Sequence, residues 1–387
     1  MFKKIKQYLI ISIVSVVFSL YLFEGYLVIN QQISTEFTLK KQLYENQKKQ
    51  KWDIRTKAQI YQDLKKTNNQ IQIPVHPNYF LGKNYPIFPL SGISNSVTIN
   101  CNENGYYTLF QSDRYGFNNP DKEWDQSEIE FFIIGDSFVL GNCVNRPHDI
   151  SSVLRDLSSK SVLNVGYANN GPLLEYASLK EYVVPNIKNI IWVYYENSDL
   201  NNLKKELNSK ILKKYIQDPN FTQNLIYKQN EIDKFLTIQI SNKINQEINS
   251  KKYFENKLSF KIKKFIDLWN VREFLFHKNR SNYKEGFNPP SEFIKIIKLA
   301  KNLAIKNNSN FHFVYLPSHH RYLSKPDNRE YEFIKKTIKN LNINFIDIHE
   351  KVFKKEENPK KFFPYELPGH YTITGYRKVS EAIFNNL

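Results

Sequence analysis

Residues 131–138, Phe-Phe-Ile-Ile-Gly-Asp-Ser-Phe, decide how the rest of the sequence is interpreted. The four apolar residues predict a buried strand, and Gly135 ends it at a tight turn that carries Asp136 and Ser137. In an open α/β sheet, ligands bind at the carboxyl ends of the strands. Ser137 is therefore a candidate nucleophile at that edge, and Asp136 is expected to support the turn.

Strand-like and helix-like segments alternate from residue 128 to residue 387. We expect strands at 128–134, 161–165, 190–195, 311–315 and 344–346, and helices at 149–157, 173–184, 291–307, 329–341 and 375–385. This alternation predicts a three-layer α/β/α domain with a mainly parallel five-stranded sheet. A Lys-, Asn- and Ile-rich insertion at about 201–288 predicts two or more helices. The insertion is either a packed decoration or a cap, since it leaves the carboxyl end of a strand.

The first 30 residues predict a membrane anchor with a short cytoplasmic tip. Residues 8–29 form a mainly apolar run that is uncharged apart from Glu24, which Gly25 follows, and they are long enough to cross a bilayer. Lysines at positions 3, 4 and 6 favour a cytoplasmic N-terminus. A cleaved signal peptide is the alternative, although no small-residue cleavage site follows the long apolar run. We expect a single pass through the inner or plasma membrane, with the catalytic domain periplasmic or extracellular.

Two further segments separate the anchor from the α/β domain. Residues 31–73 are polar, lack glycine and read as a partly helical stalk. Residues 74–127 consist of short extended pieces with Gly and Pro, and they predict a β-rich lead-in packed against the domain at 128–387.

The charge and the cysteine content limit the classes of partner. The 387-residue chain has a formal charge of +17, but its lysines are spread through the sequence instead of forming an arginine-rich block. We therefore expect no nucleic-acid partner. Cys101 and Cys143 are too few for a disulfide scaffold and lack metal-ligand spacing. They form either one bridge outside the cytoplasm or two unrelated buried thiols, and we expect neither a metal nor a cofactor.

A serine nucleophile needs a base, and His370 is the best placed of eight histidines. It lies in residues 368–375, Pro-Gly-His-Tyr-Thr-Ile-Thr-Gly, between the last strand and the last helix. This loop is expected at the same sheet edge as Ser137. His319 and His320 follow the fourth strand; as neighbours they make a poor metal pair, and either contact substrate or face solvent.

The residues around Ser137 and His370 resemble the SGNH/GDSL hydrolase superfamily. Gly-Asp-Ser at 135–137 resembles the first block of that family, residues 164–172 the second, residues 194–200 the third, and Gly-His at 369–370 the last. The resemblance extends from residue 128 to residue 387 without the insertion and implies a flavodoxin-like fold. With the anchor and the lead-in at 101–121, the chain resembles membrane-tethered bacterial members, including relatives that handle acetyl groups on polysaccharides.

The resemblance implies roles for particular residues. Ser137 would attack an ester carbonyl and His370 would accept its proton. The backbone N–H groups of Ser137 and Asn169 would bind the oxyanion, together with Ser198 or, after a one-residue shift, Asn197. The acid that usually precedes the histidine is missing, because Leu and Pro occupy positions 367 and 368. Glu366 is the nearest carboxylate that could orient the base; otherwise a backbone carbonyl must do so.

The expected function is that of a membrane-anchored serine esterase or acyltransferase. Its substrate would be an ester, such as an O-acyl group of a glycan. The alternative is a weak or inactive SGNH-like domain that binds glycan or a partner in a cell-envelope assembly. The departures at the acid and at two oxyanion positions favour that alternative.

Overall fold

The computed structural model describes residues 2–30, 36–255, 258–272, 275, 287–323 and 325–387. The chain divides into two compact units. One contains residues 1–49 and 244–286, and the other contains residues 50–243 and 287–387. The candidate catalytic residues all belong to the second unit. The boundaries expected for stalk, lead-in and catalytic domain stay predictions.

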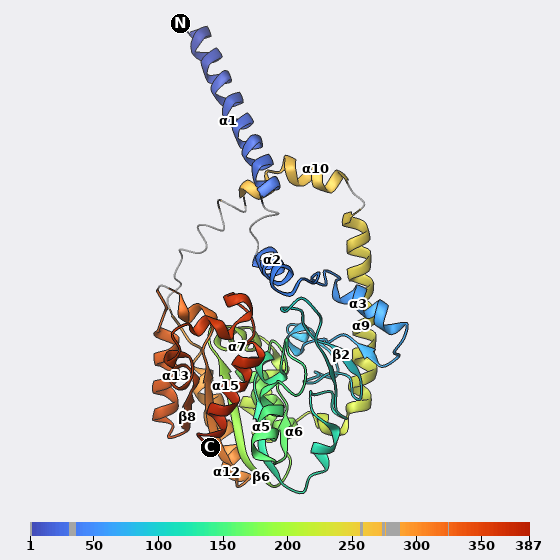
Figure 1. Ribbon diagram of the computed structural model, residues 1–387, viewed down its shortest axis with the longest axis vertical. Coiled ribbons are helices and arrows are strands. Elements are labelled where there is room, and N and C mark those ends of the chain that lie inside the picture. The colour runs from blue at the N-terminus through green and yellow to red at the C-terminus, as the bar shows by residue number, and fades with distance from the viewer. Residues whose placement is uncertain (1, 31–35, 256–257, 273–274, 276–286, 324) are drawn as a thin grey trace. The chain divides into compact units, whose positions relative to one another are not determined.

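A five-stranded parallel sheet forms the centre of the second unit (Figure 1). Its strands are β4 (Ile129–Ile134), β5 (Val162–Asn164), β6 (Ile187–Tyr195), β7 (Asn310–Leu316) and β8 (Asn344–Asp347). Their spatial order is β5-β4-β6-β7-β8. The predicted α/β fold is confirmed, and all five strands lie within three residues of their expected bounds. Because β5 and β6 are the neighbours of β4, the loops that follow them flank Ser137.

Helices cover both faces of this sheet and make the three layers. On one face, Ile133, Ile191 and Val314 share a core with α5 (Ile150–Ser158) and α15 (Ile373–Phe384). On the other face lie α6 (Pro172–Tyr182), α12 (Glu292–Lys306) and α13 (Arg329–Asn340). There the ring of Tyr194 lies 5.9 Å from that of Phe293 on α12. Burial on both faces explains why the strands are apolar throughout rather than alternating.

A small sheet combines β1 (Ile71–Gln72), at the end of the expected stalk, with β2 (Val97–Ile99) and β3 (Leu109–Gln111) of the lead-in. The short 3-10 helix η1 (Pro77–Phe80) lies between β1 and β2, and η2 (Asp121–Asp125) follows β3. Strands account for few residues of the lead-in, because Gly and Pro interrupt its extended pieces.

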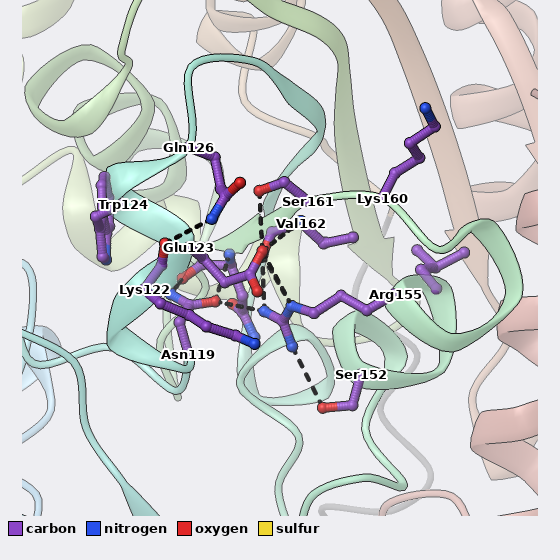
Figure 2. Close-up of polar contacts among 12 residues, drawn as sticks. Asn119, Lys122, Glu123, Trp124, Gln126, Ser152, Arg155, Lys160, Ser161 and Val162 are labelled. Atoms are coloured by element: carbon purple, nitrogen blue, oxygen red, sulfur yellow. Dashed lines mark hydrogen bonds and ion pairs between the residues drawn. The ribbon is translucent and has the colours of Figure 1, made fainter.

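A buried ion pair joins η2 to the edge of the main sheet (Figure 2). Arg155 Nε of α5 lies 3.7 Å from Glu123 Oε2. The Glu123 carboxylate also accepts hydrogen bonds from the Ser161 hydroxyl and the Val162 N–H. Arg155 in turn donates to the carbonyl of Val162 and to Asn119 Oδ1. The lead-in is therefore fixed to β5 and α5 by interactions that are largely shielded from water.

Helices account for the remaining regular structure. The first unit contains α1 (Phe2–Asn30), α2 (Glu36–Lys48) and α10 (Leu258–Ile266), and α9 (Gln229–Glu255) continues into it from the second unit. The second unit also has α3 (Lys57–Lys65), α4 (Ser137–Leu140), α7 (Asp199–Glu206), α8 (Lys210–Gln217), α14 (Ile348–Lys351), η3 (Leu225–Tyr227), η4 (His319–Tyr322), η5 (Phe353–Lys355), η6 (Pro359–Phe362) and η7 (Pro364–Glu366). Among the described residues, α1 is the one helix long and apolar enough to cross a membrane, over Lys4–Val28.

Candidate active site

The turn after β4 presents Ser137 as the first residue of α4. A Cβ atom on Gly135 would lie 2.5 Å from Val139 Cγ2 and 2.8 Å from the Val193 carbonyl, so only glycine fits there. The carboxylate of Asp136 accepts the N–H of Phe138 at 2.9 Å and caps α4. Burial raises the pKa of Asp136 to about 6. Asp136 thus supports the turn, as the sequence indicates.

His370 meets Ser137 across the edge of the sheet. The Nε2 atom of His370 lies 2.9 Å from the Oγ of Ser137. The next residue, Tyr371, is fully buried, and its hydroxyl donates to the carbonyl of Pro317 at 2.7 Å. Thr372 then caps α15 by accepting the N–H of Gly375. The contacts of Tyr371 and Thr372, which directly follow His370, therefore hold the imidazole against the serine.

The carboxylate partner of His370 is Glu103, which the sequence reasoning did not identify. Glu103 Oε1 lies 3.0 Å from Nδ1 of His370, and Oε2 accepts the His370 backbone N–H at 2.7 Å. A carboxylate beside Nδ1 favours the imidazole tautomer in which Nδ1 carries the proton. The Nε2 lone pair is then available to accept the proton of Ser137, as a general base requires.

A disulfide fixes the loop that carries Glu103. The structure joins Cys101 to Cys143, with the two Cα atoms 5.1 Å apart. The side-chain amide of Asn104 donates to the Cys143 carbonyl at 3.1 Å, and that of Asn102 donates to the carbonyl of Asp53 at 2.8 Å. Because Cys143 follows Ser137 by six residues, the bridge connects the Glu103 loop directly to the region of the nucleophile.

The expectation that Glu366 orients His370 needs correction. The Glu366 side chain accepts a hydrogen bond from Asn358 Nδ2 at 2.9 Å, and its backbone carbonyl accepts one from His319 Nε2 at 2.8 Å. Nearness in sequence was misleading here, because the carboxylate beside the imidazole comes from the lead-in. The spacing of the cysteines carried a usable signal: a bridge from Cys101 to Cys143 implies that Glu103 lies near Ser137.

The second sequence block packs closely on the nucleophile turn. The N–H of Tyr167 donates to the carbonyl of Gly135 at 3.2 Å, and Asn164 Nδ2 donates to the carbonyl of Val139. Asn169 in this block has a φ of 64°. This left-handed geometry is the one that asparagine tolerates better than most residues. The second block therefore lies against the turn that presents Ser137.

The third block separates the two candidate side chains. Asn197 Nδ2 donates to the Ser318 hydroxyl at 2.7 Å, after the end of β7, and its N–H donates to Glu330 at 2.8 Å. The hydroxyl of Ser198 accepts from Asn202 Nδ2 at 3.2 Å. A hydroxyl that accepts one bond still has its own proton to donate. The amide of Asn197 has two N–H groups and uses one of them on Ser318, so both side chains keep a donor and both remain candidates for the oxyanion.

A cavity of about 350 Å³ lies at the ends of β6 and β7, on the same sheet edge as the site. Its lining includes Asn197, His320 and Lys325. The buried ion pair between Glu196 and Arg321 also lines it. His320 therefore borders a cavity, whereas His319 is buried and donates its Nε2–H to the Glu366 carbonyl. The two imidazoles thus have different surroundings, and their ring centroids lie 6.2 Å apart.

One group of described residues has the donor atoms of a metal site. Cys101, Glu103, Cys143 and His370 each offer a ligand atom, and these atoms lie within 4.8 Å of one another. In the disulfide-bonded protein the two sulfurs are not thiolates, and thiolates are the form that binds metals. The oxidised cluster consequently does not fit a metal ion and serves to hold Glu103 against His370.

Fold and site together define a three-layer α/β protein with a serine–histidine–carboxylate arrangement at the carboxyl edge of its sheet. Among solved structures, the chain is similar to one described as "a putative lipolytic protein of G-D-S-L family from Desulfitobacterium hafniense DCB-2". That similarity has a TM-score of 0.35 and 13% identity, and it covers 67% of this chain and 100% of that chain. No family model and no curated protein matches the chain. The chemistry of the site is therefore inferred from the geometry of its residues.

Proposed function

We propose that this protein is a serine ester hydrolase or O-acyltransferase of the SGNH type. The observation that carries the proposal is the continuous hydrogen-bonded chain from Ser137 Oγ to His370 Nε2, and from His370 Nδ1 to Glu103. A serine hydroxyl becomes an effective nucleophile when a base accepts its proton and a third group orients that base. The three side chains come from three separate parts of the fold, and a turn residue with no chemical role would need no such partners.

In the first half of the reaction, Ser137 Oγ attacks the ester carbonyl and His370 Nε2 takes the hydroxyl proton. The Glu103 carboxylate stabilises the resulting imidazolium without taking its proton. The carbonyl oxygen becomes an oxyanion, and the donors proposed for it are the N–H groups of Ser137 and Asn169 and the hydroxyl of Ser198. When the tetrahedral intermediate collapses, the C–O bond to the alcohol breaks and His370 protonates the departing alkoxide.

The second half regenerates the serine. A water molecule or an acceptor alcohol attacks the acyl-serine while His370 Nε2 takes the attacking proton. Collapse of this second intermediate returns the proton to Ser137 Oγ and releases the acid or the new ester. Hydrolysis and acyl transfer share every residue in this scheme and differ only in the second nucleophile, such as a hydroxyl of a glycan.

We place the catalytic unit outside the cytoplasm, with α1 as a single-pass anchor in the inner or plasma membrane. The lysines before the apolar run and its length support this topology. The disulfide supports it as well, because such bridges persist in oxidising compartments. Alkaline phosphatase fused to residue 387 should be active in cells; an inactive but expressed fusion would contradict the assigned topology.

The decisive experiment labels the detergent-solubilised full-length protein with a fluorophosphonate probe. Wild type should become labelled at Ser137, whereas Ser137→Ala should take no label. Ser198→Ala is a useful second variant, because it keeps the nucleophile while weakening the proposed oxyanion donors. If well-folded wild type takes no label, the enzyme proposal fails and the alternative of a glycan- or partner-binding domain is favoured.

A further inference from the structure

In the first unit, the segment at residues 262–272 is attached to the end of α1 (Figure 1). The carboxylate of Glu24, which interrupts the apolar run of the sequence, is fully buried there. It accepts the backbone N–H groups of Asn270 and Val271 at 3.1 and 2.8 Å, and also the side-chain amide of Asn270 at 2.8 Å. Glu24 is thus the polar group that clamps residues 270 and 271 of the insertion onto α1.

Aromatic contacts extend this attachment by one turn toward the N-terminus of α1. The hydroxyl of Tyr21 donates to the carbonyl of Ile266 at 2.9 Å, and the ring of Tyr21 lies 5.7 Å from that of Phe265. Tyrosine is the residue type that gathers where hydrocarbon meets headgroups, since its ring is apolar and its hydroxyl is polar. Together with Glu24, Tyr21 fixes α10 to the C-terminal third of α1, the end of the apolar run that would approach the outer face of the bilayer.

Large apolar side chains of this segment remain exposed. Ile262, Phe265 and Ile266 have the i, i+3, i+4 spacing of one helix stripe and are 47%, 38% and 58% exposed. Trp269, just after α10, is 46% exposed. Among residues 262–272, the cations Lys263, Lys264 and Arg272 outnumber the single acid Asp267. Apolar and aromatic residues with lysines beside them are typical of helices that lie in a membrane interface.

We propose that α10 and the following residues, 262–272, bind the outer surface of the bilayer that α1 crosses, with anionic headgroups as the ligand of the lysines. Three observations converge on a bilayer as the occupant of this face. The face is continuous with the apolar helix, it is clamped to the C-terminal third of that helix, and its net charge is opposite to that of anionic lipids. The proposal depends on α1 as a membrane anchor and is independent of catalysis at Ser137.

The test uses the full-length protein reconstituted in vesicles of phosphatidylcholine and phosphatidylglycerol. Trp269 is isolated as the difference in emission between wild type and Trp269→Phe. When the lipids carry bromine near the headgroup end of their chains, a roughly twofold or larger loss of the Trp269 emission is expected, because an interfacial helix buries its apolar face at that depth. If Trp269 emits as a water-exposed indole and brominated lipid leaves that emission unchanged, the proposal is overturned. Blue-shifted emission without quenching would also overturn it and would indicate a protein partner or a second copy.

Two variants examine the clamp itself. Glu24→Gln places an amide where two backbone N–H groups point, so quenching of Trp269 should fall although α1 still resists carbonate extraction. Glu36→Gln, which changes a carboxylate of the same unit that pairs with Lys40, should quench as wild type does. Equal quenching in both variants would show that Glu24 does not hold the segment at the membrane.

Discussion

At the scale of single residues, the proposed site depends on Glu103 and its two hydrogen bonds to His370. Glu103→Gln keeps the size of the side chain but removes the charge that stabilises the imidazolium and fixes its tautomer. Loss of the equivalent acid in serine triads lowers kcat by up to roughly 10⁴. We expect a fall of roughly 10²–10⁴ in kcat for a small activated ester, measured with the purified full-length protein.

Glu366→Gln is the matched control for that experiment. Both carboxylates belong to loops near the site, yet Glu366 bonds to Asn358 and Glu103 bonds to the imidazole. The Glu366 variant should keep activity close to wild type. A large loss in Glu366→Gln, with Glu103→Gln unaffected, would restore Glu366 as the acid of the site.

Separation along the chain distinguishes the site residues that could be predicted from the sequence from those that could not. Ser137 could be predicted because an apolar strand, a glycine and a turn are adjacent in the chain. Glu103 could not be predicted from local pattern, since it bonds to a histidine 267 residues away from an irregular loop. Contacts of that kind are set by packing of the lead-in against the sheet.

At the scale of elements, the disulfide should contribute both to the stability of the folded protein and, by holding the Glu103 loop, to ester hydrolysis. Its cysteines are 42 residues apart, and closing a loop of that length lowers the entropy of the unfolded chain by an amount worth about 4 kcal/mol. Cys101→Ser with Cys143→Ser should therefore unfold at lower temperature and hydrolyse esters more slowly. Thermal unfolding and ester hydrolysis of the two proteins, each compared with and without reductant, measure the two effects.

Reductant should lower the unfolding temperature and the rate of ester hydrolysis of wild type to values near those of the double variant. It should leave both quantities unchanged in the double variant. Full activity of reduced wild type would mean that hydrogen bonds alone hold Glu103 in place. Alkylation of unreduced wild type should find no free thiol.

The ion pair between η2 and α5 leads to a second prediction for the elements. Arg155→Met leaves the Glu123 carboxylate largely buried without its cation, which typically costs about 3–5 kcal/mol of the free energy of unfolding. Arg329→Met removes the exposed ion pair with Asp327 and should cost about 1 kcal/mol or less. Denaturant unfolding of both variants checks the contrast; equal, small losses would mean that the lead-in is fixed to β5 by other contacts.

The elements themselves were largely predictable for a physical reason. Strands buried on both faces must be apolar throughout, and the helices between them show one apolar stripe, so β4 to β8 and their helices were found within a few residues. The small sheet was harder to predict, because β1, β2 and β3 have two or three residues each and Gly and Pro determine the path between them. Short strands leave too few positions for a periodic pattern.

At the scale of the whole molecule, buried carboxylates link stability to pH. Glu206 on α7 caps α6 by accepting the N–H groups of Gly171, Leu173 and Leu174. Burial nevertheless raises the pKa of Glu206 to about 7, although these hydrogen bonds oppose the rise. Between an unfolded pKa of about 4.3 and the folded value, the folded state holds a proton that the unfolded state lacks. The contribution of Glu206 to stability is therefore fully present below that window and is lost as pH rises through it.

Glu206→Gln cannot titrate and isolates this contribution. The free energy of unfolding of wild type relative to the variant should fall by on the order of 2–3 kcal/mol from pH 4.5 to pH 8. Denaturant titrations of both proteins at several pH values measure this difference, and His76, whose pKa burial lowers to about 3, contributes equally to both. A difference that stays constant with pH would mean that Glu206 is ionised in the folded protein throughout.

The order of the three site residues along the chain also determines when, during synthesis, the protein becomes reactive. Synthesis proceeds from the N-terminus at roughly 5–20 residues per second, so His370 emerges roughly 15–50 s after Glu103. Ser137, Cys101 and Cys143 all precede the base by more than 200 residues. A growing chain can thus form its bridge and its nucleophile turn while it still lacks the group that accepts the serine proton. Until its last segment arrives, the nascent protein is expected to be inert toward the esters around it.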